Sequence, residues 1–147
     1  AQAYYEHMPL RRTALPIGAR LQIYRQAAYG DLLDCHFLDT RQYRDDQPCG
    51  DGFKPACPEA LGPARTIMGP EEERWLFEAL ARSERRWNLV AQQVMVMPLD
   101  RRTNDTGPPI WNMDSWAGYP AARRRLLDHL RQANIRVWTP LRMQEGF

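Results

Sequence analysis

The stretch "DTRQYR" at 39–44 places charged and polar side chains directly after the apolar run 32–38. An arginine at the end of a strand offers a planar, permanently charged fork that suits phosphate or carboxylate. Arg41 is therefore the leading candidate for anion binding. A structural ion pair is the alternative, and it stays open because three acids are close in sequence: Asp39, Asp45 and Asp46.

A second group of polar and aromatic side chains stands on the segment 96–119, which is too long to be a mere connection. Asn112, Asp114 and Trp116 could reach a ligand from this segment. Packing of Trp116 and Trp111 onto the core is the alternative for the aromatic residues. For the neighbouring pair at 92–93, both glutamines, hydrogen bonds to loop backbone are favoured over ligand contacts.

The cysteines suggest one cross-link. Cys49 and Cys57 bracket the short loop "CGDGFKPAC", which is typical of a loop-closing disulfide and favours an oxidising compartment. Two reduced cysteines remain the alternative. Cys35 lies inside an apolar run and is expected to be a buried thiol. The histidines are isolated and show no zinc-ligand spacing.

Local patterns predict an α/β order of elements. A hairpin is expected from strands 21–29 and 32–38, because Gly and Asp stand at the turn between them. Proline followed by acids predicts a helix from Pro70, and Pro120 begins a second helix. The remaining expected elements are a helix at 1–8 and strands at 87–94 and 134–138.

The alternation of strand and helix after residue 32 predicts parallel pairing with right-handed crossovers. The sheet is therefore mixed, with two crossover helices. In such sheets ligands bind past the carboxyl ends of the strands. We therefore expect three segments to meet at one edge: 39–44, 92–97 and the segment from Thr139 onward. The second long segment, which carries Asp114, starts from that same edge.

Composition narrows the class of protein. The net charge of +2 is too small to indicate a nucleic-acid partner. The sequence contains no apolar run near the ~18 residues that a membrane span needs. No nucleophile motif, phosphate loop or metal-binding histidine pair is present. The residues alone thus predict an α/β domain with a pocket at the sheet edge.

Four segments together resemble the alkaline phosphatase D family, the PhoD-like phosphatases and phosphodiesterases. They are "AYYEHMPLR" at 3–11, "YRQAAYGDLLDCHFLDTRQYRDDQPC" at 24–49, "WNLVAQQVMV" at 87–96 and "NMDSWAGYPAARRRLL" at 112–127. The resemblance implies part of a metallophosphoesterase-like sandwich. It also implies hydrolysis of phosphate mono- and diesters in a secreted or periplasmic protein, with a metal centre of calcium and iron.

The family's metal-ligand motifs, of the "DDHE" and "GDVH" types, are absent from this sequence. The resemblance therefore implies that 1–147 is a single partial domain without catalytic or metal-ligating residues of its own, and that the tail 134–147 departs from the family. It favours Arg41 as a phosphate contact. Asn112, Asp114 and Trp116 correspond to the loop near the family's pocket.

Two hypotheses follow. The chain is the central part of a phosphoric ester hydrolase and supplies groups on the substrate side. Alternatively, it is a non-catalytic module that binds a phosphate-containing ligand or associates with itself, because a partial sheet exposes apolar edges and faces.

Overall fold

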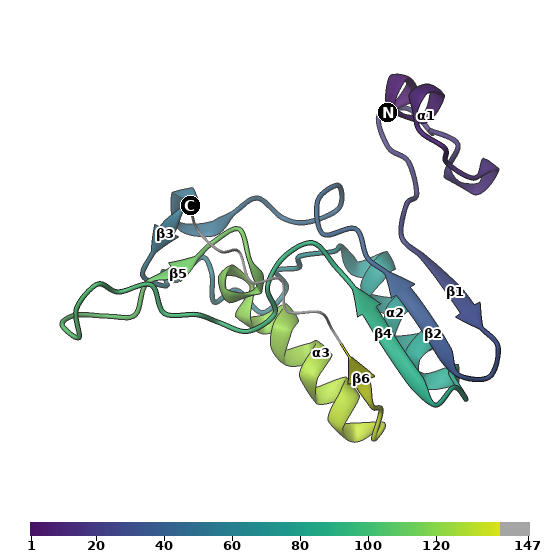
Figure 1. The fold of residues 1–147 in the computed structure, drawn as a ribbon. Helices are drawn as coiled ribbons and strands as arrows, with labels where there is room; N and C mark the ends of the chain where they lie inside the picture. The colour runs from purple at the N-terminus through teal and green to yellow at the C-terminus, as the bar shows by residue number, and fades with distance from the viewer. Residues whose placement is uncertain (139–147) are drawn as a thin grey trace.

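The computed structural model describes residues 1–138, in which four strands form a mixed sheet and two short strands form another (Figure 1). The elements are α1 (Gln2–His7), β1 (Arg25–Tyr29), β2 (Leu33–Phe37), β3 (Phe53–Lys54), α2 (Pro70–Arg82), β4 (Trp87–Ala91), β5 (Trp111–Asn112), α3 (Pro120–Gln132) and β6 (Val137–Trp138). Single 3₁₀ turns stand at Arg12–Ala14, Pro48–Gly50 and Trp116–Gly118.

The main sheet has the order β1-β2-β4-β6, which confirms the predicted mixed α/β fold. β1 and β2 pair antiparallel with Ala27 opposite Cys35, as a hairpin requires. β2 pairs with β4, and β4 with β6, in parallel. The two crossovers contain α2 and α3, so the carboxyl ends of β2 and β4 lie at the same edge.

Both crossover helices begin where the sequence predicts. Pro70 occupies the first turn of α2 and three glutamates follow it, while Pro120 begins α3. The fixed φ of proline and the acids near the positive end of the helix dipole favour this start. Neither helix, nor α1, is long and apolar enough to cross a membrane.

The core lies between the sheet and these two helices. Leu76 and Leu80 of α2, Leu126 of α3 and Val90 of β4 belong to one buried cluster. The helices are tied side by side, since the Arg125 guanidinium donates to both carboxylate oxygens of Glu73 at 2.6 and 2.9 Å. The cluster therefore holds both helices on the same face of the sheet.

The strands are shorter than predicted. β1 begins at Arg25 rather than residue 21, because the backbone N–H and C=O of Leu21 bond to the Gln42 side chain instead of a strand. β4 ends at Ala91, before the two glutamines. β6 covers only Val137–Trp138 of the predicted 134–138.

The small sheet was not predicted. β3 pairs antiparallel with β5, Phe53 opposite Asn112, and so joins the two long segments that the sequence indicated only as loops. The predicted disulfide closes the first of them, with the Cα atoms of Cys49 and Cys57 5.8 Å apart. Cys35 is a buried free thiol, as expected. Of the tail 134–147 that was predicted to depart from the family, residues 139–147 lie outside the described part.

Candidate functional site

The turn that follows β2 presents the predicted arginine. Asp39 and Thr40 are 1% and 0% exposed, whereas the Arg41 side chain is 47% exposed. One carboxylate oxygen of Asp39 accepts the backbone N–H groups of Arg41 and Gln42 at 3.0 and 3.1 Å. The start of the turn is thus buried and its backbone is fixed, whereas the Arg41 side chain is exposed.

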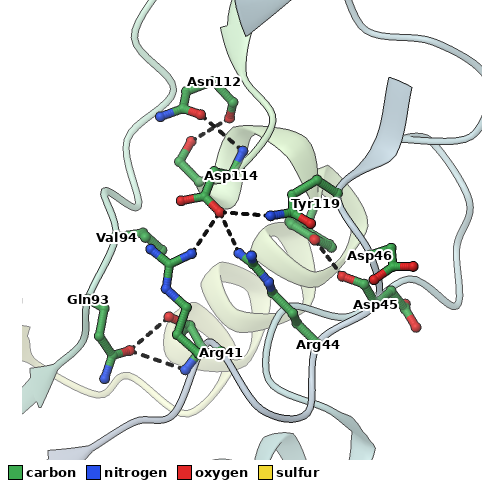
Figure 2. Close-up of polar contacts among 12 residues, drawn as sticks. Arg41, Arg44, Asp45, Asp46, Gln93, Val94, Asn112, Asp114 and Tyr119 are labelled. Atoms are coloured by element: carbon green, nitrogen blue, oxygen red, sulfur yellow. Dashed lines mark hydrogen bonds and ion pairs between the residues drawn. The ribbon is translucent and has the colours of Figure 1, made fainter. Parts of the chain in front are cut away.

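The segment just after β4 stabilises the other side of this turn. The Gln93 side-chain oxygen accepts from the N–H of Thr40 at 3.1 Å and from its hydroxyl at 2.8 Å (Figure 2). The Gln93 amide nitrogen donates to the Leu38 carbonyl. Gln92 accepts from the Trp116 indole N–H at 3.2 Å. Both glutamines therefore make the hydrogen bonds that position loops, the alternative favoured from sequence.

Two arginines converge on one carboxylate oxygen. Arg41 and Arg44 each donate to Oδ1 of Asp114 at 2.7 Å, and Gln47 donates to the same atom at 3.2 Å (Figure 2). Burial acts to raise the pKa of Asp114, but the hydrogen bonds from the two arginines outweigh it and hold that pKa below its ordinary value. Asp114 is therefore ionised at neutral pH.

The ion pair predicted as the alternative for Arg41 exists, but with a different acid. Asp39, Asp45 and Asp46 were expected from proximity, but Arg41 pairs with none of them in the described residues. The carboxylates of Asp39 and Asp45 instead accept backbone N–H groups, Asp45 from Thr66 at 2.8 Å. Buried or partly buried backbone N–H groups need a hydrogen-bond acceptor, so they take these carboxylate oxygens before an exposed arginine does. The partner of Arg41 comes from the other long segment.

Asp114 is itself held by its loop. Its backbone N–H donates to the Asn112 side chain at 3.0 Å, and Asn112 belongs to β5. Gly118 approaches the loop so closely that a Cβ atom there would overlap the carbonyl of Met113. The small sheet and this glycine thus fix where the carboxylate stands.

The predicted site residues are distributed between a cavity and the core. Arg41, Asn112 and Asp114 line a cavity of about 70 Å³ at the sheet edge, together with Gln93 and a second cation, Arg101. The turn after β2 and the segment after β4 meet at this edge as expected, together with the loop that carries Asp114. The third expected segment, from residue 139 onward, lies outside the described residues. Trp116 is 0% exposed and lies in the hydrophobic core, so its placement fits the packing alternative.

Sequence reasoning missed Arg44, Gln47 and Arg101. Arg44 stands three residues after Arg41 in the same stretch, and that spacing was the available signal. Gln47 and Arg101 carry no local signal, since their positions depend on how the two long segments pack.

The described residues do not form a metal centre. Within 1–138, no group of three or more His, Cys, Asp and Glu side chains could hold a metal ion.

The chain is similar to known proteins over most of its length. The family model described as PhoD-like phosphatase matches residues 1–139. The chain belongs to the PhoD-like phosphatase family. It is 48% identical over 134 residues to alkaline phosphatase D of Bacillus subtilis (strain 168), a match that covers 91% of this chain.

The same relation holds in three dimensions. A solved structure of PhoD superposes with a TM-score of 0.88 at 47% identity and covers 94% of this chain. This PhoD-like chain spans 23% of the curated relative and 26% of the solved chain, that is, about a quarter of each.

Proposed function

We propose that this chain carries the phosphate-contacting part of a phosphoric ester hydrolase of the alkaline phosphatase D type, with Arg41 as the phosphate contact. The substrates would be phosphate mono- and diesters, and the protein would act outside the cytoplasm. The disulfide in the first long segment supports the extracytoplasmic setting.

The observation that carries the proposal is that the two arginines paired with Asp114 differ in how far they are exposed. The Arg44 side chain is 12% exposed, whereas that of Arg41 is 47% exposed. An exposed ion pair contributes only about 0–1 kcal/mol, so a phosphate dianion can compete for Arg41 at little cost. Arg44 meanwhile keeps the Asp114 carboxylate in place.

The cavity suits a small anion. Arg41 and Arg101 bring two positive charges to it and Asp114 one negative charge, so a net positive charge faces the ligand. The fork of Arg41 can donate two parallel hydrogen bonds to phosphate oxygens. In this proposal Asn112 lines the site and holds Asp114, and Trp116 supports the loop from the core.

In this proposal the chain is part of a longer protein, which would supply the rest of the chemistry. The resemblance implies calcium and iron, which would activate a nucleophile and neutralise charge on the phosphate. We assign their ligands, and the second half of a metallophosphoesterase-like sandwich, to parts of the longer protein. Residues 1–147 would then form a partial domain without turnover of its own.

Assays with aryl phosphate mono- and diesters, with calcium and iron added, test this division. The 147-residue chain should bind phosphate through Arg41 and hydrolyse neither ester. Turnover that disappears in Arg41→Ala would show that the chain is catalytically complete, and binding that is equal in the wild type and Arg41→Ala would remove Arg41 from the site.

The non-catalytic alternative is favoured by one observation. Several large apolar side chains are exposed on the described residues, among them Ile17 at 86% and Leu61 at 61%. Such a surface favours self-association. Light scattering that shows a clean monomer at high concentration would count against a self-associating module.

A further inference from the structure

Glu72 is a buried acid that the anion site does not use directly. It stands in the first turn of α2, is 1% exposed, and its Oε1 accepts the backbone N–H of Asp39 at 2.7 Å. Its other oxygen, Oε2, is buried and has no hydrogen-bond partner among the described residues. A buried carboxylate with one unpaired oxygen is costly in its charged form.

The contact with Asp39 connects α2 to the turn that carries Arg41. Glu72 fixes the backbone of Asp39, and the Asp39 side chain in turn accepts the N–H groups of Arg41 and Gln42. Gln93 holds the turn from the opposite side through Thr40. The orientation of Arg41 therefore depends on one acid from α2 and one amide from the end of β4.

We propose that Glu72 positions Arg41 for anion binding through Asp39, and that it does so as a neutral acid. The proposal rests on the function assigned to Arg41 above. Glu72 lies one hydrogen bond away from the turn, so it is a positioning residue and not a contact of the phosphate.

The electrostatic surroundings agree with the neutral form. Burial raises the pKa of Glu72 to about 8; the N–H of Asp39 acts against this, and the Asp39 carboxylate adds to it. The positive end of the α2 dipole also favours the charged form, by about one pKa unit or less. Burial outweighs both opposing effects.

The charged and titratable groups around Glu72 come from each element packed against it. Asp39 faces it from the end of β2, and the cavity that Glu72 lines is also lined by Arg20 and Tyr24 before β1, Tyr43 and Arg44 in the turn, and Glu71 on α2. The pKa values of Tyr24 and Tyr43 are raised, mainly by burial, so both are uncharged at pH 8. Of these charged groups, the Asp39 carboxylate is the one whose charge acts on the pKa of Glu72, so ionised Glu72 would be repelled by it.

The amide signals of Asp39, Arg41 and Gln42, followed by nuclear magnetic resonance from pH 6.5 to 9.5 in the 147-residue chain, test the coupling without any ligand. They should shift together near pH 8 in the wild type and in Glu71→Gln, which removes an exposed acid one position away. They should not shift in Glu72→Gln, whose amide keeps the shape of the neutral acid. Identical titration in the wild type and Glu72→Gln would overturn the proposal.

Sulfate binding tests the consequence, because sulfate is a tetrahedral dianion that does not titrate in this range. Wild-type affinity should fall about two- to fivefold as Glu72 ionises, and Glu72→Gln should bind at every pH as the wild type does near pH 7. A folded Glu72→Gln chain that fails to bind would show that the charged form is required, against the proposal. If the wild type binds no sulfate at any pH while the amides still titrate, the proposed function fails and the coupling of Glu72 to the turn is upheld.

Discussion

The guanidinium of Arg41 lies 2.7 Å from the carboxylate of Asp114, although 73 residues separate them in the chain. This contact joins the turn after β2 to the loop after β5. It exists because the disulfide-closed segment and the second long segment pair as β3 and β5. The site is thus assembled by the two segments that the sequence could describe only as loops.

Replacing Asp114 with asparagine should lower stability. Asp114→Asn leaves the mostly buried Arg44 without its charged partner, so we expect a loss of about 1–2 kcal/mol in the free energy of unfolding at pH 7. The pKa of Asp114 is lowered in the folded state. The contribution of Asp114 to stability is therefore complete at pH values above its ordinary pKa, and it is lost as the pH falls through the folded pKa. Urea unfolding of both proteins at several pH values measures this.

The two proteins should therefore approach each other in stability as the solution is acidified. Asp128→Asn is the matched control, because the Asp128 side chain is 45% exposed and pairs with Arg131 at the surface. A loss of stability in that variant as large as in Asp114→Asn would show that the Arg44–Asp114 pair stabilises the protein no more than an ordinary surface ion pair does.

Gly118→Ala should destabilise the loop that carries Asp114. The added methyl would overlap the Met113 carbonyl, and backbone must move to relieve it. We expect a cost of at least about 2 kcal/mol in thermal or urea unfolding. Gly62→Ala is the control, because the atoms nearest to a Cβ added at Gly62 lie 3.3–3.5 Å from it and the backbone φ of Gly62 is ordinary. Equal stability of the two variants would contradict the close approach.

Loss of the disulfide should weaken both stability and the site. Closing a loop of this length contributes about 2–3 kcal/mol by the chain-entropy account, and Cys49→Ser with Cys57→Ser removes it. The released segment carries β3, so phosphate binding should weaken as well. A dithiol reductant should lower the wild-type melting temperature to that of the double variant and leave the double variant unchanged. A reductant that lowers the melting temperature of the double variant would show that it acts on something other than this disulfide.

Glu72 should make stability fall with rising pH. Its pKa is raised to about 8 in the folded protein from an ordinary 4.5, so unfolding releases a proton between these values. Its favourable contribution is complete below pH 4.5 and is lost as pH rises through 8, a change of up to about 5 kcal/mol. In Glu72→Gln this decline should vanish, whereas Glu71→Gln should retain it. Urea unfolding at pH 5, 7 and 9 compares the three proteins.

The parts of the fold that local patterns encode were predictable. Proline followed by acids marks the start of α2, and the alternation of strands and helices gives the parallel pairing of β2 with β4. The position of Arg41 at the sheet edge followed from these, because the carboxyl end of a parallel strand is where the chain leaves the core.

The remaining features depend on contacts between distant segments. Asp114 could not be chosen over Asp39 as the partner of Arg41, because nothing local shows that the Asp39 carboxylate is occupied by backbone N–H groups. Glu72 looks like one of three equivalent acids in a first helical turn. Only the packing of α2 against the turn distinguishes it.

Calorimetric titration of the 147-residue chain with inorganic phosphate at pH 7 measures whether Arg41 binds the phosphate group. Arg41→Ala should weaken binding about 10- to 100-fold, the value of a charge-assisted hydrogen bond. Arg82→Ala, which removes an arginine that is 69% exposed at the end of α2, should bind as the wild type does. Equal affinity of the wild type and Arg41→Ala would show that Arg41 does not bind the phosphate.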